Sequence, residues 1–194
     1  MKGFTMDWIF PREVPDKDSR YMGMAWMAAA FSKDPNTQVG AFLVDAANIP
    51  LGWGYNGPSR NMRDAEVNWC RPDPNDPSKI SKYDVVVHAE ENAIDHSCTT
   101  DFTDATLYVT AHPCENCMRT IVKKGIHRVV FTEFLSDASS TLRGVSRSKA
   151  QQIAHLSKNR VIIEEFKGDL GWVADWVAKM QGIGLMDRYK KAGQ

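Results

Sequence analysis

Apolar and polar positions along the chain fall into two kinds of block, which predict helices and strands in alternation. Stretches with helical spacing or rich in Met and Ala predict helices over 20–31, 88–96, 115–124, 146–157 and 172–180. Short apolar runs bounded by turn residues predict strands over 39–44, 51–55, 107–110, 128–132 and 161–166. The first two strands flank a turn at 45–48 and predict a β-hairpin.

A hairpin followed by alternating helices and strands is typical of a three-layer α/β domain. We expect a central mixed sheet with helices on both faces. We also expect a single domain over 1–194, because this length suits one hydrophobic core. The stretch 56–83 has no periodicity and carries several prolines, and a loop this long in a compact domain is usually functional or disordered.

Charge and composition narrow the classes of partner. The chain has 24 Lys and Arg and 24 Asp and Glu, so its formal net charge is zero. This balance argues against the basic surface of a nucleic-acid-binding protein and gives little protection against self-association, so we expect a homo-oligomer. The uncharged, Met- and Ala-rich run 22–32 is too short to span a bilayer. With no secretory pattern and four cysteines in no disulfide-like spacing, we expect a cytoplasmic protein without a membrane partner.

Two short motifs carry the candidate chemistry. The first contains His88 and Glu90, and the second is P-C-x-x-C from Pro113 to Cys117. Imidazole nitrogen and thiolate sulfur are ligands that Zn²⁺ binds in tetrahedral geometry, and cysteines spaced C-x-x-C at a helix start can face one ion. We predict His88, Cys114 and Cys117 as three protein ligands, which leaves the fourth position open for water, as in catalytic zinc sites.

Glu90 adds a proton carrier to this cluster. Zinc lowers the pKa of a bound water to about 7, so a zinc-bound hydroxide can attack C4 of a cytosine while Glu90 shuttles protons. The ordered pair H-x-E and P-C-x-x-C is the signature of zinc-dependent nucleobase deaminases. C-x-x-C alone also occurs in structural zinc sites, so a non-catalytic zinc-stabilised nucleotide-binding module is an alternative, although such a module does not need Glu90.

Further segments make the chain resemble the deoxycytidylate deaminases of the cytidine deaminase superfamily. The resemblance spans roughly 21–166 in the same order. It includes the H-A-E-x-N-A-I helix at 88–94, the S-K-D-P-N-x-Q-V-G-A segment at 32–41 and the G-Y-N-G turn at 54–57. It implies hydrolysis of dCMP to dUMP and ammonia, which supplies dUMP for thymidylate synthesis. It also implies that Asn56 binds the sugar and that the backbone at Ala89 and Pro113 meets the cytosine edge.

The sequence departs from this family at one substrate contact. Relatives often place a tyrosine after the strand at 129–132, where it can touch the substrate phosphate, whereas this chain has Glu133, Phe134 and Leu135. Arg60 follows the G-Y-N-G turn and is a candidate replacement, since guanidinium pairs with phosphate bidentately. The alternative is a solvated loop arginine.

The resemblance also implies regulation by nucleoside triphosphates. Related enzymes are commonly hexamers that dCTP activates and dTTP inhibits, with Mg²⁺ accompanying the triphosphate. By this analogy, the allosteric site would use residues of the early loop and of the G-Y-N-G turn: Lys33, Asn36, Gln38, Tyr55 and Gly57. The alternative is that the early loop only caps the first helix and shapes the rim of the active site.

Three further alternatives stay open from the sequence. The substrate could be dCTP, or both dCMP and dCTP, and less favoured is adenosine in tRNA, which would call for a basic, aromatic-lined channel. Cys70, His96 and Cys98 could bind a second metal, but their spacing fits no strong pattern and free thiols are the simpler interpretation. We interpret Trp172 and Trp176 as a packing or subunit contact.

Overall fold

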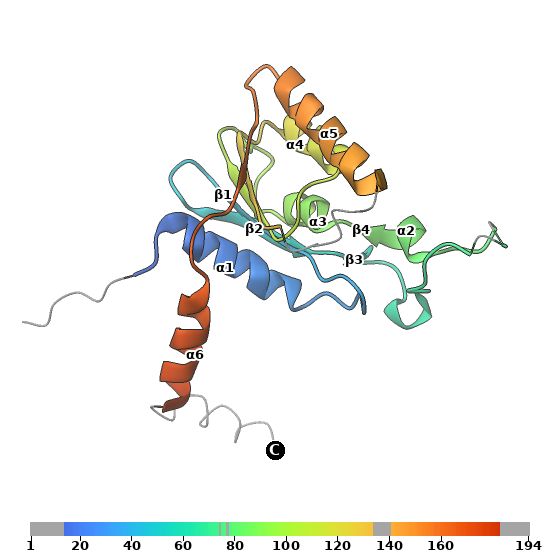
Figure 1. Cartoon of the computed structure of the whole chain (residues 1–194), viewed down its shortest axis with the longest axis horizontal. Coiled ribbons are helices and arrows are strands. Elements are labelled where there is room, and N and C mark those ends of the chain that lie inside the picture. Colours follow the sequence, from blue (N-terminus) through green and yellow to red (C-terminus); the bar gives the residue numbers. More distant parts are fainter. Residues whose placement is uncertain (1–13, 74, 77, 134–140, 183–194) are drawn as a thin grey trace, which may run out of the picture.

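A mixed five-stranded sheet lies at the centre of the computed structural model, which describes residues 14–73, 75–76, 78–133 and 141–182 (Figure 1). The strand order is β2-β1-β5-β6-β7. β1 is antiparallel to both neighbours, while β5, β6 and β7 are parallel. The strands are β1 (Gly40–Val44), β2 (Pro50–Tyr55), β5 (Thr106–Val109), β6 (Arg128–Phe131) and β7 (Ile162–Glu165).

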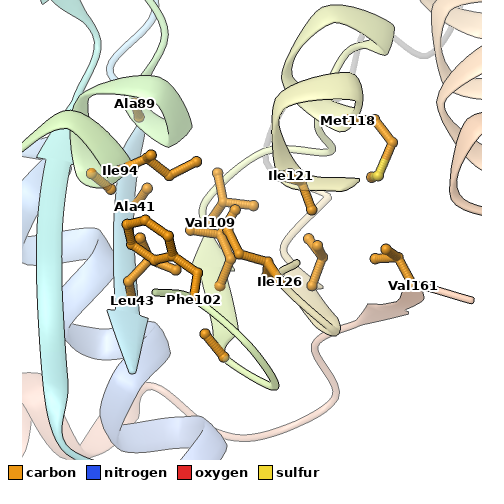
Figure 2. Close-up of a cluster of buried hydrophobic side chains, with 14 of the residues drawn as sticks. Ala41, Leu43, Ala89, Ile94, Phe102, Val109, Met118, Ile121, Ile126 and Val161 are labelled. Carbon is orange, nitrogen blue, oxygen red and sulfur yellow. The ribbon is translucent and has the colours of Figure 1, made fainter. Parts of the chain in front are cut away.

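Helices cover the two faces of this sheet unequally. One buried cluster joins side chains of α3, α4 and α5 to the strands, and Figure 2 shows it as a continuous core. The other cluster packs Met22 and Ala25 of α1 against Phe42 and Tyr108 of the opposite face. The predicted three-layer α/β fold is therefore confirmed. The helices are α1 (Lys17–Ala29), α3 (Ala89–Asp95), α4 (Glu115–Lys124), α5 (Thr141–Leu156) and α6 (Gly171–Gly182).

Two predicted helix starts were too late. α1 begins at Lys17 because Asp16 caps it, accepting a hydrogen bond from the backbone N–H of Ser19 at 3.0 Å. α5 begins at Thr141, five residues before the predicted start. Trp172 of α6 packs on α1, where its Nε1 donates to the carbonyl of Ser19 at 3.3 Å, while the side chain of Trp176 lies outside the described residues.

The stretch 56–83, predicted without regular structure, contains short elements. They include one strand of a two-stranded sheet, and the second strand of this sheet lies just after the stretch. Pro58 pairs with Val86 across this small sheet. This pairing brings the end of the long loop back beside its beginning, directly before His88. The elements are β3 (Gly57–Pro58), a 3₁₀ turn (Asp64–Glu66), α2 (Lys82–Val85) and β4 (Val86–Val87).

Two glycines of β2 allow α3 to pack directly on the strand backbone. A Cβ added at Gly54 would lie 2.3 Å from the nitrogen of Ala93, and one at Gly52 would lie 2.5 Å from its carbonyl oxygen. A hydrogen bond of 2.8 Å from Asn92 Nδ2 to the carbonyl of Tyr55 holds the same contact. Because α3 follows His88 in the chain, this close packing also positions the candidate metal ligand.

No helix in the described ranges is both long enough and apolar enough to cross a membrane.

We expect Gly54→Ala to lower the free energy of unfolding by about 1–3 kcal/mol, because its methyl group forces α3 away from β2. Chemical denaturation measures the change. Gly144→Ala is the matched control, since among the described residues no atom beyond its chain neighbours and its own helix backbone lies within 4 Å of a Cβ at this position in α5. There the same substitution should stabilise the protein by about 0.5–1 kcal/mol through helix propensity. Equal effects at the two positions would contradict the packing argument.

Candidate metal and nucleotide site

The starts of α3 and α4 meet at one point and bring the two sequence motifs together. His88 is the N-cap residue of α3 and Cys114 the N-cap residue of α4, and both have extended backbone angles. Cys117 lies one turn into α4 and is buried. The positive end of the α4 dipole favours thiolates at its first turn. Two elements far apart in the sequence thus present imidazole and thiol groups to each other.

The three donor atoms have the spacing of a tetrahedral metal site. His88 Nδ1 lies 3.2 Å from Cys117 Sγ and 3.6 Å from Cys114 Sγ, and the two sulfurs are 3.6 Å apart. Tetrahedral zinc with bonds of about 2.3 Å to sulfur and about 2.0–2.1 Å to nitrogen requires S···S near ~3.8 Å and N···S near ~3.6 Å. The donor set and its spacing therefore fit Zn²⁺. Within the described ranges, it is the one group of three such residues that could hold a metal.

Mutual hydrogen bonding already favours a thiolate in this cluster. The contact with Cys117, followed by the contact with His88, lowers the pKa of the Cys114 thiol to about 4. The hydrogen bond with Cys114 raises the pKa of the His88 imidazole to about 9. The pKa of the Cys117 thiol is raised, because it shares the hydrogen bond with Cys114 and is buried. A divalent cation would replace these shared protons, since zinc binds the deprotonated forms.

Glu90 lies in the pocket beside these donors and has little contact with solvent. It is 4% exposed, and burial raises the pKa of its carboxyl group. A carboxyl group that is held this way next to a metal site can accept a proton and release it again within the pocket.

A cavity of about 280 Å³ opens beside the cluster. Asn56, Ala89, Glu90 and Pro113 all line it, so the structure brings these predicted residues together with the metal ligands. The Asn56 side chain already makes two hydrogen bonds within the protein. Its Nδ2 donates to the carbonyl of Thr37 at 2.8 Å, and its Oδ1 accepts from the N–H of Val39 at 2.7 Å. One N–H and one lone pair of this amide remain for a ligand.

Several other residues that line this cavity had no clear signal in the sequence. Lys82 lies in the aperiodic stretch, and Arg147 lies one residue inside the predicted helix 146–157. Asp34 lay within the S-K-D-P-N segment, but its role as the partner of Lys82 depends on a contact across 48 positions. Only the folded chain brings these charges to one cavity. The residues concerned are Asp34, Thr37, Lys82, Tyr83, His112, Ser146 and Arg147.

Arg60 lies in a different place from the expected phosphate contact. It lines a second cavity of about 490 Å³ and is absent from the lining of the first. Three residues predicted for an allosteric nucleotide, Lys33, Tyr55 and Gly57, line the second cavity as well.

The other two predicted allosteric residues, Asn36 and Gln38, line neither cavity. Asp34 holds them, because its Oδ1 accepts from the N–H of Asn36 at 2.9 Å and its carbonyl accepts from Gln38 Nε2. The three residues suggested for a second metal do not form a metal-binding group in the described part of the chain. Cys70 and Cys98 are exposed free thiols, and His96 lines the second cavity.

Comparison with known proteins agrees with this geometry. The model of the family "Cytidine and deoxycytidylate deaminase zinc-binding region" matches residues 15–133, more than half of the sequence. The chain belongs to this family. Human deoxycytidylate deaminase is 40% identical over 111 residues, 57% of this chain and 61% of that protein. The deoxycytidylate deaminase of Mycobacterium phage D29 is 35% identical over 122 residues, 60% of this chain and 94% of that protein.

A solved structure supports the fold. The dCMP deaminase of the cyanophage S-TIM5, crystallised with dCMP and dUMP, superposes with a TM-score of 0.56 at 22% identity. The superposition covers 80% of this chain and all of that chain. Against the mammalian relatives, by contrast, the alignment spans about three fifths of their length.

The donor geometry predicts one Zn²⁺ per chain, measured by elemental analysis of the purified protein. Cys117→Ser should lose the metal, because it removes the buried sulfur donor, and Glu90→Gln should retain it. Cys98→Ser is the control, since this thiol is exposed and outside the cluster. Full zinc content in the Cys117 variant would contradict the assigned ligand set.

Proposed function

We propose that this protein catalyses the hydrolytic deamination of dCMP to dUMP and ammonia, supplying dUMP for thymidylate synthesis. The observation that carries the proposal is the position of Glu90 in one cavity with the His88, Cys114 and Cys117 cluster. The names of the matched relatives support dCMP as substrate, as do the ligands of the cyanophage enzyme.

The metal donors and Glu90 have separate roles in this mechanism. His88, Cys114 and Cys117 would hold Zn²⁺, which when bound supplies activated water at neutral pH. Glu90 takes a proton from the attacking water and gives it to the ring nitrogen N3. It then takes the proton of the new C4 hydroxyl and delivers it to the amino group, so that the C4–N bond breaks, C4 becomes a carbonyl and ammonia departs.

Other residues that line the cavity would bind the base and the sugar. Ala89 and Pro113 bring backbone groups to the cavity, where they would meet the polar edge of cytosine. Asn56 offers its remaining amide hydrogen and lone pair to the sugar. Because the protein already fixes this amide through Thr37 and Val39, it loses little conformational freedom when a ligand binds.

Regulation by dCTP and dTTP with Mg²⁺, in a hexamer, is the second part of the proposal. The second cavity contains Lys33 and Arg60, cations suited to a triphosphate, together with Tyr55 and Gly57. α3 would connect the two sites. Its N-cap His88 lines the first cavity, while Asn92 lines the second and donates to the carbonyl of Tyr55. Asn36 and Gln38 would contribute by holding the loop around Asp34.

Ammonia release from a panel of deoxycytidine, dCMP, dCTP and adenosine-bearing tRNA tests the activity. We expect dCMP to give the highest kcat/KM, and Glu90→Gln to lower turnover by at least ~10²–10⁴-fold while zinc is retained, because the proton shuttle is lost. Glu91→Gln is the matched control on the same helix. Preference for dCTP or tRNA would replace the proposed substrate, and near-normal turnover in the Glu90 variant would remove its role.

The dependence of rate on dCMP concentration tests regulation. We expect a sigmoidal curve that dCTP makes hyperbolic and dTTP makes more sigmoidal, because each effector binds one of two conformations more tightly, with coupling of about 1–3 kcal/mol. Lys33→Gln should weaken both effects. A hyperbolic curve from a monomer, insensitive to both triphosphates, would exclude the regulatory part and leave the deaminase activity standing.

A further inference from the structure

The active-site cavity is lined by two basic side chains, Lys82 and Arg147, which are held in different ways. Lys82 forms a buried ion pair with Asp34, whose Oδ2 lies 2.8 Å from its Nζ, and the two side chains are 8% and 3% exposed. Arg147 pairs with Glu133, and these side chains are 29% and 37% exposed. The two ion pairs therefore differ in how readily a negatively charged ligand can displace the protein carboxylate.

Lys82 is held by its buried ion pair with Asp34. Asp34 also accepts hydrogen bonds from the backbone N–H groups of Asn36 and Thr37, at 2.9 Å and 3.2 Å, so it cannot move without releasing the loop. Separating a buried pair leaves an uncompensated charge, which costs several kcal/mol. A substrate phosphate would therefore find Lys82 already neutralised.

Arg147 can exchange its partner at small cost. A partly exposed ion pair contributes little to stability, so the guanidinium loses little when it leaves Glu133. A phosphate monoester carries up to two negative charges and accepts two parallel hydrogen bonds from guanidinium. The geometry points to Arg147 as the residue that recognises the 5′-phosphate of the substrate, an inference that rests on the proposed deamination of a nucleotide.

The position of Arg147 relative to the metal donors is fixed by its neighbour. Ser146 hydrogen-bonds to the carboxylate of Glu115, the first residue of α4, directly after the ligand Cys114. This bond ties α5 to the helix start that carries the metal site. Figure 1 shows the beginning of α5 and the helix α2 on the same side of the molecule, and both line the cavity. A nucleotide with its base at Glu90 can extend its phosphate toward Arg147.

This assignment replaces the phosphate contact that the sequence had suggested for Arg60. Arg60 lines the second cavity, whereas Arg147 lines the cavity that contains Glu90. It also offers a partner for the phosphate in a chain whose segment 133–135 lacks the tyrosine common in relatives. We therefore expect selectivity for a nucleotide over a nucleoside to depend on Arg147.

The test compares kcat/KM for dCMP and for deoxycytidine in wild type, Arg147→Gln and Arg147→Lys. We expect Arg147→Gln to reduce kcat/KM for dCMP by about 10–100-fold, the range typical of a charge-assisted hydrogen bond, and to change the value for deoxycytidine less than about two-fold. Arg147→Lys should retain part of the preference for dCMP. Arg119→Gln is the matched control, because this arginine is exposed on α4 and outside the cavity.

Glu133→Gln separates recognition from a structural role for the ion pair. It frees Arg147, so kcat/KM for dCMP should stay the same or rise, whereas a structural pair would make both variants equally damaging. Zinc content and thermal unfolding establish that each variant is folded. Equal losses of dCMP and deoxycytidine activity in Arg147→Gln, or a nucleotide-specific loss in Arg60→Gln alone, would overturn the inference.

Binding of dUMP distinguishes this inference from the proposed function. If the wild-type protein deaminates neither compound, the proposed function fails, and calorimetry with dUMP and deoxyuridine then decides the role of Arg147. Weaker binding of dUMP alone in Arg147→Gln would still support phosphate recognition. Unchanged binding of dUMP in that variant would contradict it.

Discussion

The packing of α3 on β2 is the contact on which the rest of the site depends. Gly52 and Gly54 leave no side chain between the strand and the helix, so the backbone of Ala93 comes as close as sterics permit. The helix start at His88 is thereby fixed relative to the sheet, and α4 packs on the same face. Because metal donors must lie within a few tenths of an ångström of their required spacing, a tightly packed scaffold is what makes three separate residues act as one site.

Charges around the cavity that contains Glu90 are organised in internal pairs. The buried pair of Asp34 and Lys82 ties the loop after α1 to α2, and the more exposed pair of Arg147 and Glu133 ties α5 to the end of β6. Paired charges keep the cavity from acquiring a broad basic field, which agrees with the zero net charge of the chain. Such a cavity suits one small anion better than a long polyanion.

α3 is also the element that the two cavities share. Its first turn contributes Ala89 and Glu90 to one cavity, and its last turns contribute Asn92 and His96 to the other. A helix this short moves as one body, so a ligand that displaces its end would shift its beginning. The packing against Gly54 sets how far such a displacement can go before backbone atoms collide.

The sequence by itself determined the fold class and singled out the three candidate metal donors that the structure brings together. Local periodicity reports which residues face a core, and a short motif such as C-x-x-C places its own members on one helix face, so both can be inferred without long-range contacts. The helix start at Lys17 was missed because the Asp16 cap begins α1 before its apolar repeat, and α5 likewise begins before its predicted start, at Thr141.

Only the tertiary structure decided which charged residues share a cavity. Arg60 is close to Asn56 in sequence yet lines the second cavity, while Asn56 and the sequence-distant Arg147 line the first. The pairing of Asp34 with Lys82 likewise spans 48 positions through an aperiodic loop. Polar side chains at a cavity carry no periodic signal, because their position depends on how separate elements pack and not on the pattern within any one of them.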